Sequence, residues 1–298
     1  MPVRTGVIGV GLMGAGHARL LSHVVSGSEL TAVFDVDQRR AETVAAACGA
    51  RVLDDPMVLI KDDVVDAVLL ASPDQSHEQF VLACLAAGKP VLCEKPLAPD
   101  VAGCVRILQA ESDLGRRLLS VGFMRRYDPG YAELKNALQD CGLGHSLLMH
   151  CVHRTAVAVG QTSAMLISGS AVHEIDIARW LLEEELVSVT VHRPRPSARS
   201  GGTQDPMLLV FSSASGVLVD VEMFLNAGYG YDVRCEVVAE GGTVLLDSPP
   251  PTVRRMSGQC ARAVPADWRP RFAEAGIRAL DTGRQQDVSL RDKPALYR

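Results

Sequence analysis

The feature that most constrains this chain is a glycine-rich turn near its start. Residues 9–14 read Gly-Val-Gly-Leu-Met-Gly; an apolar run at 7–10 leads into them and a helical pattern over 15–25 follows. A second apolar run, 30–34, ends at Asp35, which lies 21 residues after Gly14. A strand, a glycine turn, a helix, a strand and an acid about 20 positions later form the fingerprint of a dinucleotide-binding βαβ unit.

Each glycine of this turn has a physical task. Gly9 permits the tight turn, Gly11 lets a pyrophosphate approach the backbone, and Gly14 lets the helix pack closely on the strand. The free N–H groups at the start of the helix attract phosphate. The same glycine pattern also occurs in ordinary strand-to-helix turns, so the flanking strands and the spacing to Asp35 are what make it specific.

Asp35 decides which dinucleotide we expect. A carboxylate at this place accepts hydrogen bonds from a ribose 2′-hydroxyl and repels a 2′-phosphate. Val36 follows it, with neither Arg nor Ser at that position, so we expect no cation beside Asp35. The sequence therefore predicts NAD as the cofactor, with NADP disfavoured.

Composition excludes several other classes of protein. With 298 residues the chain is long enough for two domains, and 47% apolar with 22% charged residues is ordinary for a globular protein. The net charge is -5, so the chain lacks the excess of basic residues that is typical of nucleic-acid-binding proteins. No apolar run is long enough to span a membrane. The eight cysteines include no C-x-x-C pair, so we expect no metal site and scattered reduced thiols. No signal peptide is visible, and we expect a cytoplasmic protein.

The first 122 residues alternate short apolar strands with helices. After Asp35 we expect helices at 38–48, 76–87 and 101–112, and strands at 51–53, 67–71, 90–93 and 118–122. This alternation predicts an α/β Rossmann domain with a doubly wound parallel sheet over residues 1–122. In such sheets the ligand lies at the carboxyl ends of the strands.

The pattern changes after residue 122. We expect helices at 128–139 and 170–182, strands at 145–153 and 186–192, and hairpins formed by 207–211 with 217–226 and by 233–239 with 243–247. Residues 248–270 look irregular. Consecutive hairpins indicate an α+β domain with an open, mostly antiparallel sheet over residues 123–298.

Lys95 lies between Glu94 and Pro96, directly after a buried strand. A lysine held at that edge can donate hydrogen bonds to an alcohol or carbonyl oxygen and stabilise alkoxide character during hydride transfer. The alternative is a solvent-exposed loop lysine.

These segments together resemble a known family. Gly9–Gly14, the run Val-Leu-Cys-Glu-Lys-Pro-Leu-Ala at 91–98 and His-Glu-Ile-Asp at 173–176 resemble the Gfo/Idh/MocA oxidoreductases. The segment Gly-Phe-Met-Arg-Arg-Tyr-Asp-Pro-Gly-Tyr at 122–131 resembles the inositol 2-dehydrogenase branch. The resemblance implies NAD-dependent oxidation of a secondary hydroxyl, or reduction of the ketone, of a cyclic polyol or sugar-like substrate. It also implies a homo-oligomer, a dimer or tetramer, formed through the open sheet.

The resemblance also implies roles for individual residues. It makes Lys95 and His173 catalytic. It places cofactor contacts on the glycine turn, at strand ends and at the junction of the domains: Gly9, Gly11, Leu12, Met13, Gly14, Asp35, Val36, Ser72, Pro73, His77, Glu94, Lys95, Met124 and Arg125. It places substrate contacts at Tyr127, His153, Thr155, Gly169 and Tyr231.

Purely structural roles are the alternative for several of these residues. Without the resemblance, His173 is a packed or capping histidine of an amphipathic helix. His153 and Tyr231 are then strand residues, and Arg125 only binds the cofactor or holds the domain junction. His17 and His23 are expected on a solvated helix face.

The chain departs from the family pattern at three places. Gly169 stands where the family has an Asp four residues before the catalytic His, and Thr155 stands where this branch has Asn. A helical segment that relatives carry is absent between Ala275 and Gly276. If Ser170 caps the helix, His173 lies in its first turn, where the helix dipole favours the neutral ring that a base needs; Asp176 could approach it. The alternative function is a protein that binds the nucleotide but has lost simple dehydrogenation, and serves another reaction or a binding or regulatory role.

Overall fold

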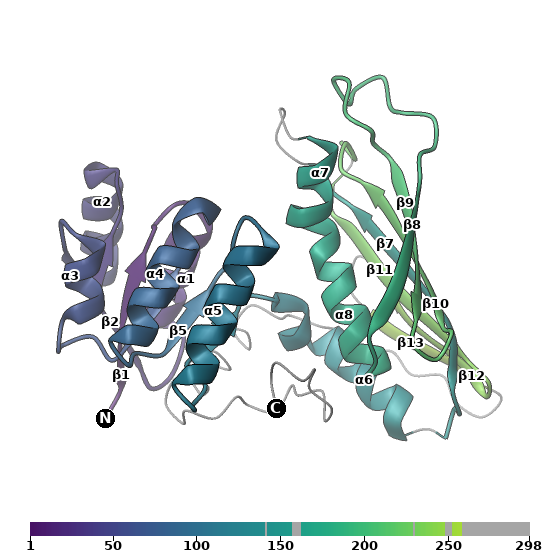
Figure 1. Ribbon diagram of the computed structural model, residues 1–298, viewed down its shortest axis with the longest axis horizontal. Coiled ribbons are helices and arrows are strands. Elements are labelled where there is room, and N and C mark those ends of the chain that lie inside the picture. Colours follow the sequence, from purple (N-terminus) through teal and green to yellow (C-terminus); the bar gives the residue numbers. More distant parts are fainter. Residues whose placement is uncertain (141, 157–161, 229, 248–251, 258–298) are drawn as a thin grey trace. The chain divides into compact units, whose positions relative to one another are not determined.

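The computed structural model describes residues 1–140, 142–156, 162–228, 230–247 and 252–257. The described residues form two compact units, Met1–Met124 and the described part of Arg125–Trp268 (Figure 1). Within these residues no helix is both long and apolar enough to cross a membrane.

The first unit contains a six-stranded sheet in the order β3-β2-β1-β4-β5-β6, with every pair parallel. The strands are β1 (Val3–Ile8), β2 (Ser28–Phe34), β3 (Arg51–Val52), β4 (Ala67–Leu70), β5 (Val91–Cys93) and β6 (Leu119–Val121). The helices are α1 (Leu12–His23), α2 (Gln38–Cys48), α3 (Pro56–Lys61), α4 (Asp74–Ala86) and α5 (Val101–Asp113). The predicted parallel, doubly wound sheet is confirmed, and its strand order reverses between β1 and β4, where such folds bind nucleotides.

Strands β4 and β5 are buried along their whole length, because a parallel sheet is covered by helices on both faces. Their uninterrupted apolar runs made them predictable. Helix α3 was not predicted, although it has a start signal: Asp55 accepts a hydrogen bond from the Met57 N–H, and Pro56 opens the helix.

The glycine turn between β1 and α1 leaves no room for side chains at two positions. A Cβ on Gly14 would lie 1.8 Å from the Gly9 carbonyl oxygen, and one on Gly9 would lie 2.5 Å from the Ser72 nitrogen. Gly9 also has a φ of 85°. A Cβ on Gly11 would meet nothing within 4 Å, so the space in front of this turn is open.

Two glycines of α1 give a matched pair of variants. We expect Gly14→Ala to push the helix off the turn, to cost roughly 1–3 kcal/mol of stability and to weaken NAD binding by at least about 10-fold. A Cβ on Gly16, two residues later, meets nothing within 4 Å, so Gly16→Ala should be neutral or stabilise by up to about 1 kcal/mol. Thermal melting and NAD titration of the two variants check this, and equal behaviour would contradict it.

The second unit contains a seven-stranded sheet in the order β13-β12-β11-β7-β10-β9-β8. The strands are β7 (Ser146–Arg154), β8 (Leu186–His192), β9 (Met207–Ser213), β10 (Leu218–Phe224), β11 (Asp232–Ala239), β12 (Gly242–Asp247) and β13 (Thr252–Ser257). Among these described strands only β7 and β10 pair in parallel, so the predicted open, mostly antiparallel sheet is confirmed. The expectation of irregular structure from residue 248 was wrong for 252–257, because pairing with β12 organises a segment without a clear apolar alternation.

Three helices lie on one face of this sheet: α6 (Pro129–Asp140), α7 (Ser163–Leu166) and α8 (Val172–Leu182) (Figure 1). A π-helical turn, η2 (Ile167–Ala171), joins α7 to α8 in one continuous helical run. Ser170 therefore does not cap the helix, and the condition under which His173 would lie in the first turn is not met. His173 follows several helical residues, and the dipole argument for a first-turn histidine does not apply.

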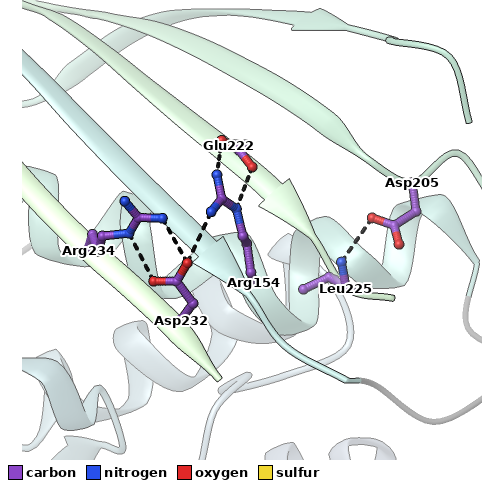
Figure 2. A network of polar contacts seen from close by, with 6 residues as sticks. All are labelled: Arg154, Asp205, Glu222, Leu225, Asp232 and Arg234. Carbon is purple, nitrogen blue, oxygen red and sulfur yellow. Dashed lines mark hydrogen bonds and ion pairs between the residues drawn. The ribbon is translucent and has the colours of Figure 1, made fainter. Parts of the chain in front are cut away.

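Strand alternation divides the side chains of the sheet between its two faces. Met149, Cys151 and His153 of β7 are buried, whereas the next residue, Arg154, lies on the other face. There Arg154 donates to Glu222 at 2.6 and 2.8 Å and to Asp232 at 3.0 Å, and Arg234 binds Asp232 as well (Figure 2). His153 thus lies in the helix-covered core and Arg154 in a charged network on the opposite face.

The described cysteines, namely Cys48, Cys84, Cys93, Cys104, Cys151 and Cys235, are free thiols. Burial raises the pKa of Cys84 to about 12, which keeps this thiol protonated and unreactive at neutral pH.

Candidate active site

The glycine turn of the first unit has open space in front of it that could hold a nucleotide. Beside the open space at Gly11, residues Leu12 and Met13 are 94% and 50% exposed, and Val36 is 90% exposed. Exposed apolar side chains around a phosphate-binding turn fit the ribose and base of a dinucleotide. The residues present therefore fit NAD.

Asp35 is buried at the end of β2 and is held by backbone groups. It accepts hydrogen bonds from the N–H groups of Val10 at 2.8 Å and Asp37 at 2.9 Å. The Arg40 guanidinium lies 3.2 Å from the same carboxylate and 3.3 Å from Asp37. The expectation of no cation beside Asp35 was wrong, because the first turn of α2 brings Arg40 back to it. The two carboxylates neutralise that cation, which keeps the position unfavourable for a 2′-phosphate.

Asp35→Ser should therefore change the preference for the cofactor. It removes the acceptor for the ribose hydroxyl and leaves Arg40 facing the position of a 2′-phosphate. We expect kcat/KM with NAD to fall by about 10-fold to 100-fold and use of NADP to appear. The control is Asp35→Ser combined with Arg40→Ala, which should lose the gained NADP activity. NADP use that does not depend on Arg40 would contradict this role.

Two buried histidines bind the loops at this edge: His77 joins the loops after β4 and β5, and His17 joins α1 to the end of β5. The ring nitrogens of His77 lie 2.7 Å from the Pro96 carbonyl oxygen and 2.8 Å from that of Ser72. His17 of α1 lies 2.8 Å from the Glu94 carboxylate, and both side chains are largely buried. The expectation of a solvated His17 was wrong, because α1 packs its His17 side toward the end of β5.

Lys95 follows β5 directly and is partly buried. Its backbone N–H donates to the Glu94 carboxylate at 3.3 Å. Glu94 in turn fills the space beside Gly122, where a Cβ would lie 2.9 Å from its carboxylate oxygen. The first unit thus brings the glycine turn, Asp35, Ser72 with Pro73 and Glu94 with Lys95 to the carboxyl edge of one sheet.

The second unit contains a buried charged cluster that extends from η1 (Met124–Tyr127) to β7 and α8. Arg125 and Glu174 form an ion pair with side chains 5% and 0% exposed. The Nδ1 atom of His153 lies 3.0 and 3.1 Å from the two Glu174 oxygens and 3.3 Å from a terminal nitrogen of Arg125. The Arg125 guanidinium also lies 5.7 Å from the centre of the Tyr131 ring.

The charges of this pair stabilise each other against burial. Burial favours the neutral form of Arg125, but the Glu174 carboxylate outweighs it and raises the pKa of Arg125. Burial likewise favours neutral Glu174, but Arg125 and the hydrogen bond from His153 outweigh it and lower the pKa of Glu174. The pair is therefore ionised at neutral pH.

His173 of α8 belongs to the same region. Its ring centre is 6.5 Å from that of His153, and the ring centre of Tyr231, a residue that is 55% exposed, lies 6.3 Å from that of His153. Gly169 lies in η2, where a Cβ would meet nothing within 4 Å. Asp176 is bound by the Arg126 guanidinium through both carboxylate oxygens, and burial raises the pKa of Asp176 although Arg126 opposes it.

The remaining predicted residues border this cluster along the chain. Met124 and Tyr127 lie in η1, and burial raises the pKa of Tyr127. Thr155 follows β7 and donates its N–H to the Phe224 carbonyl at 3.1 Å. The sequence did not single out Glu174, Arg40 or His17 as site residues. The segment absent between Ala275 and Gly276 falls outside the described residues.

Within the described residues, no group of three or more His, Cys, Asp or Glu side chains is arranged to hold a metal ion.

Comparison with known proteins decides the family. Residues 3–123 match the oxidoreductase family with an NAD-binding Rossmann fold, Gfo/Idh/MocA, and residues 131–245 match a Gfo/Idh/MocA C-terminal domain. The chain belongs to this family. Among proteins similar to this Gfo/Idh/MocA oxidoreductase is inositol 2-dehydrogenase 1 of Saccharopolyspora erythraea, 48% identical over 100% of this chain and 99% of that protein. The inositol 2-dehydrogenase of Streptomyces avermitilis is 44% identical over 98% and 96%.

The fold of this chain is also similar to that of a solved inositol dehydrogenase structure. The myo-inositol dehydrogenase from Lactobacillus casei, in complex with NAD(H) and myo-inositol, has a TM-score of 0.82 and 30% identity and is covered over its whole length, as is this chain. The alignment with the Saccharopolyspora erythraea protein has 335 positions for the 298 residues here, so this oxidoreductase lacks residues that this relative has.

Proposed function

We propose that this protein is an NAD-dependent dehydrogenase that oxidises a secondary hydroxyl of an inositol or a related cyclic polyol, or reduces the corresponding ketone. The observation that carries the proposal is the similarity to inositol 2-dehydrogenases along the whole chain, at 48% identity. The glycine turn and Asp35 support it, since they provide the phosphate-binding turn and the ribose-binding acid of an NAD-binding βαβ unit.

In this proposal the glycine turn, Asp35 and the Ser72 loop hold the cofactor. NAD, when bound, supplies the nicotinamide that accepts hydride. The ammonium group of Lys95 donates hydrogen bonds to the substrate oxygen and stabilises its alkoxide character. A histidine of the second unit takes the hydroxyl proton, and the family resemblance gives that role to His173. Tyr127, Thr155 and Tyr231 are proposed to contact the substrate.

The proposal also covers the roles of the two domains, the location of the protein in the cell and its oligomeric state. We assign residues 1–122 to the cofactor domain and 123–298 to a substrate and oligomerisation domain with a shortened C-terminal part, in a cytoplasmic protein. We assign the charged face of the second sheet, which carries the Arg154 network, to contacts between copies of the chain in a dimer or tetramer.

The competing function is nucleotide binding without dehydrogenation, which rests on Gly169 in place of the family's Asp. The relatives do not favour it. Two measurements distinguish the two functions. The protein is first titrated with NAD and NADH, and the nicotinamide absorbance is then followed in the presence of myo-inositol, other cyclitols and hexoses.

We expect NADH to form with at least one inositol. NAD binding without NADH formation from any polyol, together with a gain of inositol oxidation in Gly169→Asp, would support the competing function. Because a Cβ at residue 169 meets nothing within 4 Å, this variant has room to fold. Undetectable NAD binding would overturn both functions.

A further inference from the structure

His77 of α4 lies between two backbone carbonyl groups. Its Nδ1 atom is 2.7 Å from the Pro96 oxygen, and its Nε2 atom is 2.8 Å from the Ser72 oxygen. Among the residues that the structure describes, these are the hydrogen bonds of the ring. His77 is only 1% exposed, so bulk water does not compete for them. The ring therefore joins the loop after β4 to the loop after β5.

The two contacts decide the charge of this ring. A carbonyl oxygen can only accept hydrogen bonds, and a neutral imidazole has one N–H and one lone pair. A neutral His77 could satisfy one of the two oxygens and would turn its lone pair toward the other. The imidazolium has an N–H at both nitrogens and can donate to both oxygens, and such charge-assisted hydrogen bonds are the stronger kind. The geometry of His77 thus fits the protonated ring.

The groups closest to His77 along α4 and β5 act on this charge in both directions. Asp74 lies one turn earlier on α4, and Glu94 follows β5, so their carboxylates favour an imidazolium. The N-terminal end of α4 and the ammonium group of Lys95 oppose it. Cys93 of β5 is neutral, because burial raises the pKa of its thiol well above the usual value.

The other elements packed against α4 add little net charge near His77. Arg106 of α5 and Glu78 of α4 form an ion pair and neutralise each other. Asp55 and Asp100 accept hydrogen bonds from the first turns of α3 and α5, which they cap. Strand β4 is apolar, and Lys61 ends α3 where the chain returns to the start of β4, at the opposite edge of the sheet. The charge of His77 is therefore stabilised chiefly by its two carbonyl partners.

We infer that His77 is held as an imidazolium and that its proton ties the Ser72 loop to the loop that carries Lys95. The inference rests on the proposed dehydrogenase function and adds a positioning residue to it, because there Ser72 borders NAD and Lys95 contacts the substrate oxygen. When His77 loses a proton to solvent, the neutral ring keeps one N–H, and the loop that faces its lone pair is released. The tie is complete only in the protonated protein, so NAD affinity should fall as pH rises.

The first test measures the charge of His77 without a ligand. In protein with ¹⁵N-labelled histidine, NMR distinguishes a doubly protonated ring from either neutral form. The signals of His77 are assigned by their loss in His77→Gln, or by through-bond assignment in the wild type if that variant does not fold. We expect hydrogen on both ring nitrogens at pH 7. A neutral ring at pH 7 would overturn the inference.

The second test follows NAD affinity of the wild-type protein against pH. Coupling between two binding events is reciprocal. NAD should therefore move the deprotonation of His77, observed by NMR, to higher pH. NAD affinity should fall by about 5-fold to 150-fold as pH rises through that deprotonation, which is the usual range for such a coupling. An affinity that stays constant across the deprotonation of His77 would overturn the tie.

His77→Gln separates a proton-dependent tie from a merely structural role. The amide of Gln stays neutral and has a single nitrogen, so it cannot replace two donors that point in different directions. We expect this variant to bind NAD weakly at neutral pH and with an affinity that no longer changes over the same pH range. A pH dependence equal to that of the wild type would overturn the inference.

The matched control is His23→Gln. His23 is an exposed histidine of α1 in the same unit, and its ring contacts one carbonyl oxygen, that of Ala47 at 3.2 Å. This variant should keep the wild-type NAD affinity and its pH dependence. If it loses them to the same extent as His77→Gln, the effect does not come from the two-carbonyl contact of His77, and the inference is overturned.

The tests fail separately from the proposed function. A wild-type protein that binds NAD with the expected pH dependence but oxidises no polyol supports the inference and overturns the proposed function. A neutral His77 in an active dehydrogenase overturns the inference alone. A wild-type protein that binds no NAD overturns both.

Discussion

Lys95→Ala is expected to lower turnover on a cyclitol by about 10²-fold to 10⁴-fold while NAD still binds. The lysine directly follows the buried strand β5, beside Glu94, which His17 holds from α1. The loss concerns charge that develops on the substrate oxygen only during reaction, so kcat should fall more than KM changes.

The measurement is steady-state kinetics with an NAD titration on the same samples. Lys95→Arg tests whether positive charge alone suffices, and we expect it to stay impaired because a guanidinium differs from an ammonium in shape and reach. Lys61→Ala, which removes an exposed lysine at the end of α3, should behave as wild type. Full turnover in Lys95→Ala would remove Lys95 from the catalytic site.

Glu174→Ala is expected to cost about 3–5 kcal/mol of folding stability, because it leaves the Arg125 guanidinium buried without its counter-charge. Glu185→Ala is the matched control: Glu185 pairs with Arg179 in the same unit, but its side chain is 46% exposed, and we expect less than about 1 kcal/mol. Urea unfolding of both variants measures the difference. Similar losses for the two would show that burial does not decide the strength of the pair.

The contribution of Glu174 should also depend on pH. The pKa of Glu174 is lowered in the folded protein, so its stabilising effect is complete above the unfolded value of about 4.3 and is lost as pH falls through the folded value. The stability gap between wild type and Glu174→Gln should therefore be constant near neutral pH and narrow in acid below about pH 4. A gap that widens in acid would contradict an ionised Glu174.

The fold was largely predictable because its patterns are local. The glycine turn, the spacing to Asp35 and the apolar runs of β4 and β5 each record a nearby physical constraint, either a close approach of backbones or burial on both faces. Strand β13 could not be predicted because its order comes from pairing with β12. The continuous helical run before His173 was missed for a related reason: Ser170 offers a capping signal that η2 does not use.

The site was predictable mainly where a family pattern exists. His153 was expected as a substrate contact, but nothing local in the sequence joins it to Glu174, which lies 21 residues later on another element. The same holds for Arg40 beside Asp35 and for His17 beside Glu94. Such partners are chosen by tertiary packing rather than by the local sequence.

The most direct test of the proposed dehydrogenase is the fate of the hydrogen on the oxidised carbon. The purified protein would be incubated with NAD and myo-inositol, or the best cyclitol, deuterated at the ring carbons. The proposal predicts that deuterium appears on the nicotinamide ring of the NADH formed, together with the matching ketone. Deuterium that appears only in water, or substrate conversion without NADH, would contradict it.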